Sequence, residues 1–185
     1  MGIILKHLES RTGLLFRKFV TRDMNVLRKA FITYIRPMLQ YASSIWSPTQ
    51  VDLIDRIESV QRQFTKRIAV LQELSYSERL TALNLKSLEY RRLCLDLYLL
   101  YKIIFGTFDV NLNSILSLRG DVPTRSHRYK VMLEHCTNNY RKNFFVQRVA
   151  PIWNSLPAGS IVDFSSFTSF KRLLNKVNLR IFTRF

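Results

Sequence analysis

The stretch from Ser47 to Leu71 carries the most constraining pattern in this chain, because its apolar residues recur every three or four positions. These apolar residues are Leu53, Ile57, Val60, Phe64, Ile68 and Leu71. The opposite side carries Arg56, Arg62, Lys66 and Arg67. This spacing predicts an amphipathic helix that buries one face. Ser47 followed by Pro48 is typical of a helix start, so we expect the helix to run from Pro48 to Leu71.

Other segments also carry helix signals at their ends. Asp23 can cap a helix that ends or kinks near Pro37, since proline lacks an amide hydrogen. Ser75 and Glu78 form a capping-box pattern, and Ser87 can cap a helix that runs to about Phe105. That helix is apolar on most sides, which is typical of buried helices. Further signals are Gly106 as a helix stop and Ser165 or Ser166 as the cap of a last helix.

These signals predict a mainly α fold: a helical bundle followed by a smaller mixed, partly irregular carboxy-terminal segment. The pattern breaks down from 107 to 124, where we expect a linker. One or two short strands are expected after it, in Arg125–Leu133 and in Asn143–Val149, although Asn143–Val149 fits a helix equally well.

Charge is the most informative part of the composition. The 185 residues include 29 Lys and Arg against 13 Asp and Glu, a net charge of +16. Such a field attracts polyanions, so RNA, RNA–DNA hybrid or DNA is the expected partner. Two basic regions, 1–72 and 107–185, flank a nearly neutral middle. No apolar stretch reaches spanning length, so we expect no membrane partner.

Several basic clusters are candidate phosphate-binding sites, because their side chains donate charge-assisted hydrogen bonds. Four rings, Tyr129, Tyr140, Phe144 and Phe145, lie beside them and offer stacking surfaces. For Phe144 and Phe145 we favour a place in the core, and we expect His127 to join a phosphate-facing loop. The candidate nucleic-acid-binding residues are Arg56, Arg62, Lys66, Arg67, Arg91, Arg92, Arg125, Arg128, Lys130, Arg141, Lys142, Lys171 and Arg172.

The sequence offers little for catalysis. Two-metal phosphoryl transfer needs clustered carboxylates, yet no Asp-Asp pair occurs, and Asp52 and Asp55 fit the start of a helix, where they offset its dipole. His127, His135 and Cys136 do not make the two close ligand pairs of a structural zinc site. We therefore expect no enzyme activity, no metal and no cofactor in this chain. Its two cysteines fit a reducing, intracellular compartment, the nucleus, the cytoplasm or both.

The run from Tyr34 to Pro48, YIRPMLQYASSIWSP, resembles a hallmark of non-LTR retrotransposon reverse transcriptases of the jockey-like group. Further similar blocks follow in the family's order and cover roughly residues 11 to 177. They are Ser59–Ile68, Leu74–Leu80, Leu83–Arg92, Asp96–Leu97, Tyr101–Ile104, Arg141–Arg148, Trp153–Pro157 and Ser169–Lys171. Gln40 replaces an acid that is often found at this place in the family.

The resemblance implies a thumb-like and carboxy-terminal piece of an RNA-directed DNA polymerase. The catalytic Tyr-X-Asp-Asp motif of the family does not occur here, and magnesium would belong to the full enzyme. Residues 1–22 would connect to a missing fingers and palm core, 23–106 would form the thumb-like domain, 107–124 a linker and 125–185 a basic carboxy-terminal segment. Arg62, Lys66 and Arg67 would hold an RNA–DNA duplex by its backbone.

Two other interpretations remain open at this point. The chain fits a helical interaction module whose apolar faces pack on the missing core. It also fits the product of a decayed element without activity of its own. The sequence sets no oligomeric state and no preference among nucleic acids.

Overall fold

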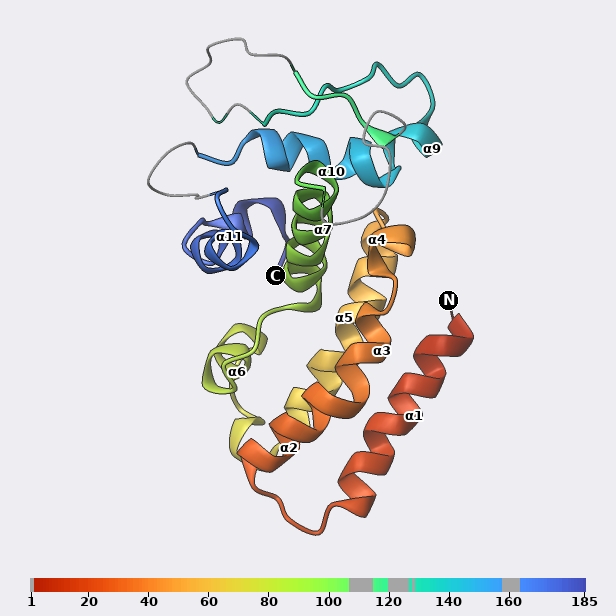
Figure 1. Ribbon diagram of the computed structural model, residues 1–185. Coiled ribbons are helices and arrows are strands. Elements are labelled where there is room, and N and C mark those ends of the chain that lie inside the picture. Colours follow the sequence, from red (N-terminus) through yellow and green to blue (C-terminus); the bar gives the residue numbers. More distant parts are fainter. Residues whose placement is uncertain (1, 107–114, 120–126, 128, 158–163) are drawn as a thin grey trace. The chain divides into compact units, whose positions relative to one another are not determined.

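The computed structural model describes residues 2–106, 115–119, 127, 129–157 and 164–185, and it is mainly helical, which confirms the predicted fold class (Figure 1). The chain forms two compact units, residues 1–92 with Phe185 and residues 93–184. This division lies within helix α7 (Leu88–Ile104). Much of the predicted linker at 107–124 lies outside the described residues, so the predicted domain boundaries stay predictions.

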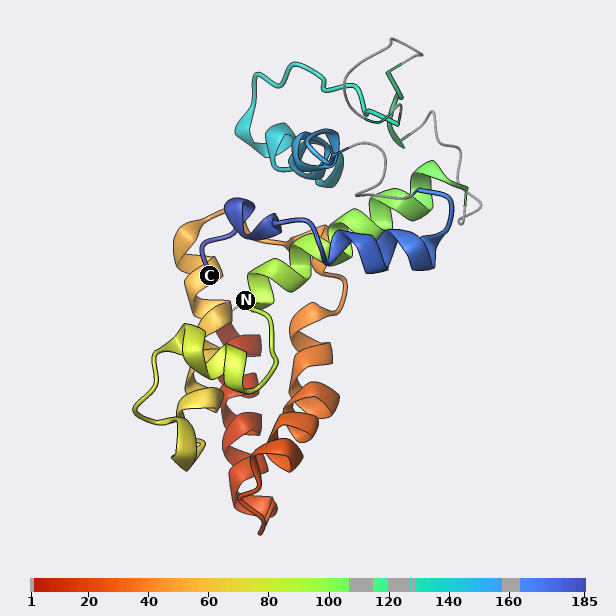
Figure 2. The same cartoon turned by 90° about the vertical axis from the view of Figure 1, so that its left-hand side faces the viewer.

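The first unit is built on three rods of helix. In Figures 1 and 2, α1 (Gly2–Lys18) and α5 (Val51–Lys66) run in the same direction, and the segment between them returns in the opposite direction. That segment consists of α2 (Met24–Ala30), the π turn η1 (Phe31–Ile35), α3 (Arg36–Gln40) and α4 (Ser43–Trp46). A short 3-10 turn η2 (Ala69–Leu71) and α6 (Tyr76–Ala82) lead to α7.

The core of the first unit contains the predicted apolar stripe of α5. Ile57, Val60 and Phe64 are at most 1% exposed. The Phe64 ring stacks on Phe31 with centroids 4.4 Å apart, and Phe16 of α1 packs on its other neighbours at 5.4 Å from the same ring. Burial of these large side chains fixes α1 and the returning segment against α5.

Most predicted helix starts are confirmed. The Asp23 carboxylate accepts from the amide of Val26 at 2.9 Å, and Ser75 and Glu78 form the complete capping box. Ser87 Oγ accepts from the amide of Tyr90 at 3.2 Å. The helix that starts at Met24 widens into the π turn just before Pro37, which has no hydrogen for the carbonyl four residues earlier.

The predicted start of the central helix at Pro48 is wrong. Ser47 instead closes α4, since its amide donates to the carbonyl of Ser43 at 2.7 Å, and α5 begins at Val51 after an extended Gln50. The α-helix also ends at Lys66 rather than Leu71. Ile68 and Leu71 are nevertheless buried, because the 3-10 turn keeps them on the core side.

The second unit packs α7 with helices from the carboxy-terminal part: α9 (Asn139–Lys142), α10 (Phe145–Asn154), α11 (Phe167–Leu174) and the 3-10 turn η3 (Leu179–Phe182). Its core is aromatic, and Trp153 and Phe170 are fully buried. The Phe170 ring stacks on Tyr101 at 4.7 Å. Ser166 caps α11 by accepting from the amide of Ser169 at 3.1 Å, as one of the two predicted alternatives requires.

The described residues contain one isolated bridge in place of the expected strands. Leu118 pairs with Val131, and Asn154 holds Val131 through both its side-chain atoms, at 2.9 and 2.8 Å. In Asn143–Val149 the helical alternative holds, because α10 begins at Phe145. In the described part of the chain, no helix is long and apolar enough to cross a membrane.

Candidate nucleic-acid interface

A hollow of about 620 Å³ lies between α1 and the end of α5, and three arginines line it. Arg17 comes from the last turn of α1, Arg22 from the loop that follows, and Arg67 from the residue after α5. Arg67 also lines an adjoining hollow of about 490 Å³ together with Lys66. We call Arg17, Arg22, Lys66 and Arg67 the α1–α5 basic end.

The parallel course of α1 and α5 brings these cations together. Both helices finish at the same end of the unit, and each carries basic residues in its last turn. The partial negative charge of the terminal carbonyls favours cations there, which is a structural reason for their presence. The Arg22 guanidinium serves such a role, since it donates to the carbonyl of Phe16 at 2.8 Å.

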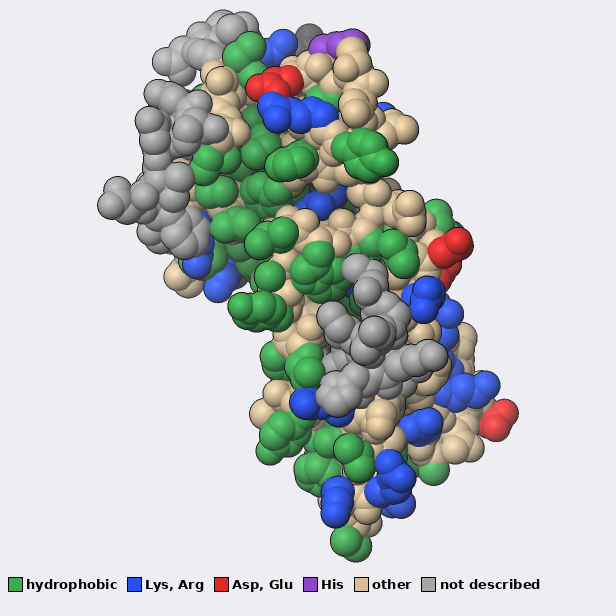
Figure 3. All heavy atoms as spheres, turned by 90° about the vertical axis from the view of Figure 1, so that its right-hand side faces the viewer, with side chains coloured by type: hydrophobic (Ala, Val, Ile, Leu, Met, Phe, Trp, Pro, Cys, Tyr) green, Lys and Arg blue, Asp and Glu red, His purple; other side chains and the backbone are tan. Residues whose placement is uncertain are grey.

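Arg67 is positioned by a small residue across the hollow. A methyl group on Gly13 would lie 3.6 Å from Nη1 of Arg67, so the guanidinium lies directly over the backbone of α1. Arg17, Lys66 and Arg67 are exposed, and no described carboxylate forms an ion pair with any of them. In Figure 3, Lys and Arg side chains gather on one flank of this unit. An open, unpaired cation cluster can bind phosphates with little desolvation cost.

The other predicted residues of α5 have different surroundings. Arg56 is exposed and lines neither hollow. The Arg62 guanidinium lies over the rings of Tyr76 and Phe185, at 5.3 and 5.2 Å from their centroids. Such cation–π contacts fix the side chain, so Arg62 belongs to the surface that packs α5, α6 and the last residue together.

Arg92, another predicted binding residue, is 2% exposed and faces a buried polar network of the first unit. At its centre Glu58 accepts hydrogen bonds from the amides of Leu88 and Glu89 at the start of α7, and from the Tyr76 hydroxyl. Burial raises the pKa of Glu58, while these bonds and the charge of Arg92 act in the opposite direction. Burial and the Glu58 carboxylate also raise the pKa of Tyr76. This geometry gives Arg92 a structural role.

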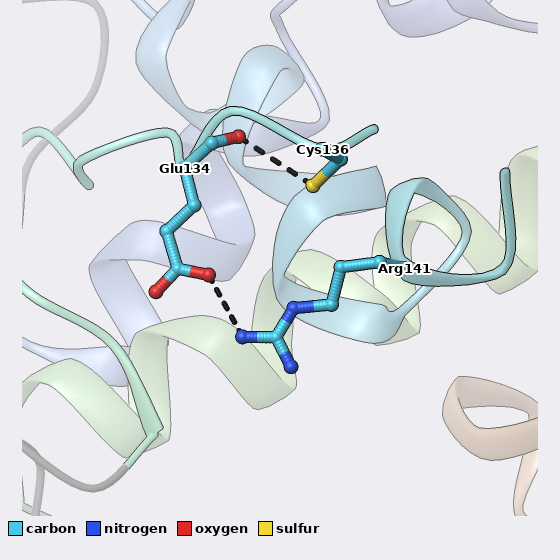
Figure 4. Close-up of polar contacts among 3 residues, drawn as sticks. All are labelled: Glu134, Cys136 and Arg141. Carbon is cyan, nitrogen blue, oxygen red and sulfur yellow. Dashed lines mark hydrogen bonds and ion pairs between the residues drawn. The ribbon is translucent and has the colours of Figure 1, made fainter. Parts of the chain in front are cut away.

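The predicted binding residues of the second unit are dispersed. Arg141 forms an ion pair with Glu134 at 2.8 Å, and the Cys136 thiol donates to the Glu134 carbonyl (Figure 4). Lys171 lies over the Phe167 ring at 4.4 Å, and Lys142 and Arg172 are exposed. Lys130 is half-buried beside the isolated bridge, where its carbonyl accepts from the amide of Arg119 at 2.7 Å. Arg125 and Arg128 lie outside the described residues.

Two expectations about this unit are wrong. His127 is only 6% exposed, and its Nε2 contacts the Trp153 carbonyl at 2.9 Å inside the aromatic core, so it does not join a phosphate-facing loop. Burial lowers the pKa of His127, and the charge of Lys130 acts in the same direction. Phe144 is 66% exposed and is not a core residue. It lies on a mainly apolar hollow of about 630 Å³ that also exposes Met132 and Leu133.

The sequence indicated Lys66 and Arg67 but missed Arg17 and Arg22. The latter pair lies more than forty positions away along the chain, and no local spacing links the two pairs. The basic last turn of α1 was the available signal, although it is equally typical of any helix end. Among the described residues, no three His, Cys, Asp or Glu side chains are grouped closely enough to hold a metal ion.

No family model and no solved structure matches this chain. It is similar to a Caenorhabditis elegans protein named "Uncharacterized protein B0403.1", with 25% identity over 97 residues. The match covers 51% of this chain and 49% of that protein, so the chain corresponds to about half of the relative's length. The name of the relative states no activity.

Proposed function

We propose that this chain is a non-catalytic, nucleic-acid-binding part of a non-LTR retrotransposon RNA-directed DNA polymerase. In this role it holds template RNA or RNA–DNA hybrid by the phosphate backbone, inside the cell, while a separate fingers and palm core performs magnesium-dependent synthesis. The proposal draws on the resemblance of the Tyr34–Pro48 run and the blocks that follow it. It also draws on the net charge of +16.

The α1–α5 basic end is the observation that carries the proposal. Four cations from α1, the following loop and α5 border two adjoining hollows, with Arg67 lining both. The side chains point to phosphates rather than to base edges, because Lys and Arg on an open surface contact backbone without sequence preference. A polyanion that follows both hollows would contact cations from both helices at once.

The test is a titration of fluorescently labelled RNA–DNA hybrid, read by anisotropy over a series of salt concentrations. We expect the unsubstituted protein to bind, with affinity falling steeply as salt rises. The double variant Lys66→Glu, Arg67→Glu should bind at least about tenfold more weakly at low salt, with a salt slope smaller by about two. Lys176→Glu, also exposed, is the control for a single charge reversal and should bind nearly normally.

Two outcomes would count against the proposal. Absence of binding to hybrid, RNA and DNA alike at low salt would remove nucleic acid as the partner. Binding that is unchanged in the double variant would show that the α1–α5 basic end is not the contact surface.

An exposed apolar stripe favours a second candidate, a docking module for a protein partner. Tyr34, Met38, Tyr41 and Ile45 recur at helical spacing along η1 to α4, and they are 59, 36, 81 and 87% exposed. Large side chains in such a row are typical of surfaces that another protein covers. The partner of this interpretation is the fingers and palm core. A sharp, monomeric peak in size-exclusion chromatography with light scattering, at high protein concentration, would count against a strongly adhesive surface.

A further inference from the structure

A second group of cations lies in the first unit, away from the α1–α5 basic end. Arg28 of α2, Arg36 at the start of α3 and Arg91 of α7 are each partly buried, and no described carboxylate forms an ion pair with any of them. Arg91 and Arg36 act on one another through space, as do Arg28 and Arg36. Gln40 at the end of α3 joins the group, since its Oε1 accepts from Nη2 of Arg91 at 3.5 Å.

The donors of this group are unsatisfied. Nε of Arg28, Nε of Arg91 and Nε2 of Gln40 are shielded from solvent and have no hydrogen-bond partner among the described residues. Buried donors are nearly always paired in proteins, and each unpaired one costs stability. Three such donors on one group of neighbouring side chains therefore indicate an absent acceptor with several oxygens.

Electrostatics supports the same reading. Partial burial, together with the charges of Arg91 and Arg28, lowers the pKa of Arg36 to about 10. The guanidinium is still protonated at neutral pH, so three positive charges are held near one another without compensation. The group also lies on both sides of the π turn η1, and π turns occur frequently at functional sites, where they re-aim side chains.

We propose that Arg28, Arg36, Arg91 and Gln40 form a binding site for a phosphate dianion. Arginine forks match phosphate oxygens in a bidentate way, and the Gln40 amide adds a neutral donor. A terminal phosphate carries close to two negative charges at neutral pH, whereas an internal phosphodiester carries one. Three arginines therefore favour a terminal phosphate or free phosphate over the backbone of a continuous strand.

Free inorganic phosphate and the 5′-phosphate of a nucleic-acid strand offer the same chemistry, so the experiment has one arm for each. In the first arm, the melting temperature of the full chain is measured in sodium phosphate and in sodium chloride at matched ionic strength. We expect phosphate to raise the melting temperature above the chloride value, because a ligand that binds only the folded state stabilises it. This arm does not depend on the proposed function.

The second arm rests on the proposed function. It compares two oligonucleotides of the same sequence, one with a 5′-phosphate and one with a 5′-hydroxyl group, in the anisotropy assay. We expect the 5′-phosphorylated strand to bind about tenfold more tightly if its end occupies the site. Equal affinity of the two strands, together with a phosphate-specific shift in the first arm, would assign the site to free phosphate.

Arg36→Gln and Lys29→Gln are the variant and its matched control. Lys29 is exposed and lies next to Arg28 on α2. Arg36→Gln should lose the phosphate-specific shift while melting at the same or a higher temperature in chloride, since it removes a repelling charge. A purely structural arginine would instead lower the melting temperature in chloride. Lys29→Gln should keep the phosphate response.

The outcomes separate the two proposals. No phosphate-specific shift in the unsubstituted protein, or a shift that survives in Arg36→Gln, would overturn the phosphate site. A phosphate-specific shift in a protein that binds no nucleic acid would support the site and refute the proposed function. If Arg36→Gln proves to be misfolded by circular dichroism, Arg28→Lys retains the charge but lacks the fork, and it should weaken the phosphate response.

Discussion

The two units carry the same excess of positive charge but dispose of it differently. The first unit has sixteen Lys and Arg against eight Asp and Glu, and the second has thirteen against five, so each exceeds neutrality by eight. In the first unit, Arg17, Arg67 and Arg36 have no ion-pair partner among the described residues. In the second, Arg148 pairs with Asp96 and Arg141 pairs with Glu134.

The hollows differ in the same way. The first unit has an arginine-lined hollow, whereas that of the second unit is lined mainly by apolar side chains such as Leu116 and Phe144. In Figure 3, hydrophobic side chains gather over the second unit. Net charge therefore says that a protein attracts polyanions, while the pairing of each cation says where a phosphate can displace only water.

The largest effect should come from a paired arginine of the second unit compared with an unpaired one of the first. Arg148 lies 2.9 Å from Asp96, which is 3% exposed. Arg148→Gln leaves that carboxylate without its guanidinium, and we expect a loss of about 3 kcal/mol in the free energy of unfolding. Arg67→Gln should leave stability nearly unchanged. Urea denaturation followed by circular dichroism measures both.

Equal losses in the two variants would break the comparison. They would mean that Arg67 supports the fold as Arg148 does, and that its open position is not its essential property. Two separate unfolding transitions would sharpen the comparison, because each variant should then shift only the transition of its own unit.

A smaller effect should appear in the pH dependence of the second unit. Burial keeps His127 neutral in the folded state, whereas the unfolded chain takes up a proton below about pH 6.5. Stability should therefore fall as pH drops below about 6.5, by up to about 1.4 kcal/mol per pH unit, until the lowered pKa of the folded state is reached.

The control for this effect is His127→Gln, which can still donate to the Trp153 carbonyl but does not titrate. The difference in unfolding free energy between the two proteins should grow on acidification. Glu58 titrates in both, so its contribution cancels. A constant difference between pH 7 and pH 5 would mean that His127 is protonated in the folded state, as an exposed histidine would be.

The smallest effect should come from Glu134→Gln, which removes the carboxylate partner of the exposed Arg141. Stability should not change measurably, since exposed ion pairs contribute little. If pairing is what keeps Arg141 from phosphates, the variant should bind RNA–DNA hybrid slightly more tightly, by less than about threefold. Weaker binding would instead mean that the ion pair orders the contact surface.

Local chemistry made several elements predictable from the sequence. The capping box of Ser75 and Glu78 and the cap at Asp23 were correct because donor and acceptor lie three residues apart. The apolar stripe of α5 was correct because burial of a row of large side chains outweighs the exact place where the helix ends. The start at Pro48 was wrong because a second local solution, the short α4, uses Ser47 for its own end.

Features that depend on distant partners were not predictable in this way. Glu58 caps α7 from thirty residues away, and no spacing rule announces it. Arg92 was placed at the surface by its neighbour Arg91, yet the helix turns it into the core. His127 was placed in a phosphate loop by the arginines beside it, whereas the aromatic core around Trp153 buries it.

The π turn Phe31–Ile35 has a consequence for how this protein tolerates insertion and deletion. A π turn holds one residue more than an α-helical turn, so removing any single residue there would restore regular winding. Everything after it on the helix would then rotate by about 100° relative to what precedes it. Arg36 and Gln40 would swing away from Arg28, and Ile35 and Leu39 would leave the core with them. The reading frame of this helix is thus fixed from two sides at once.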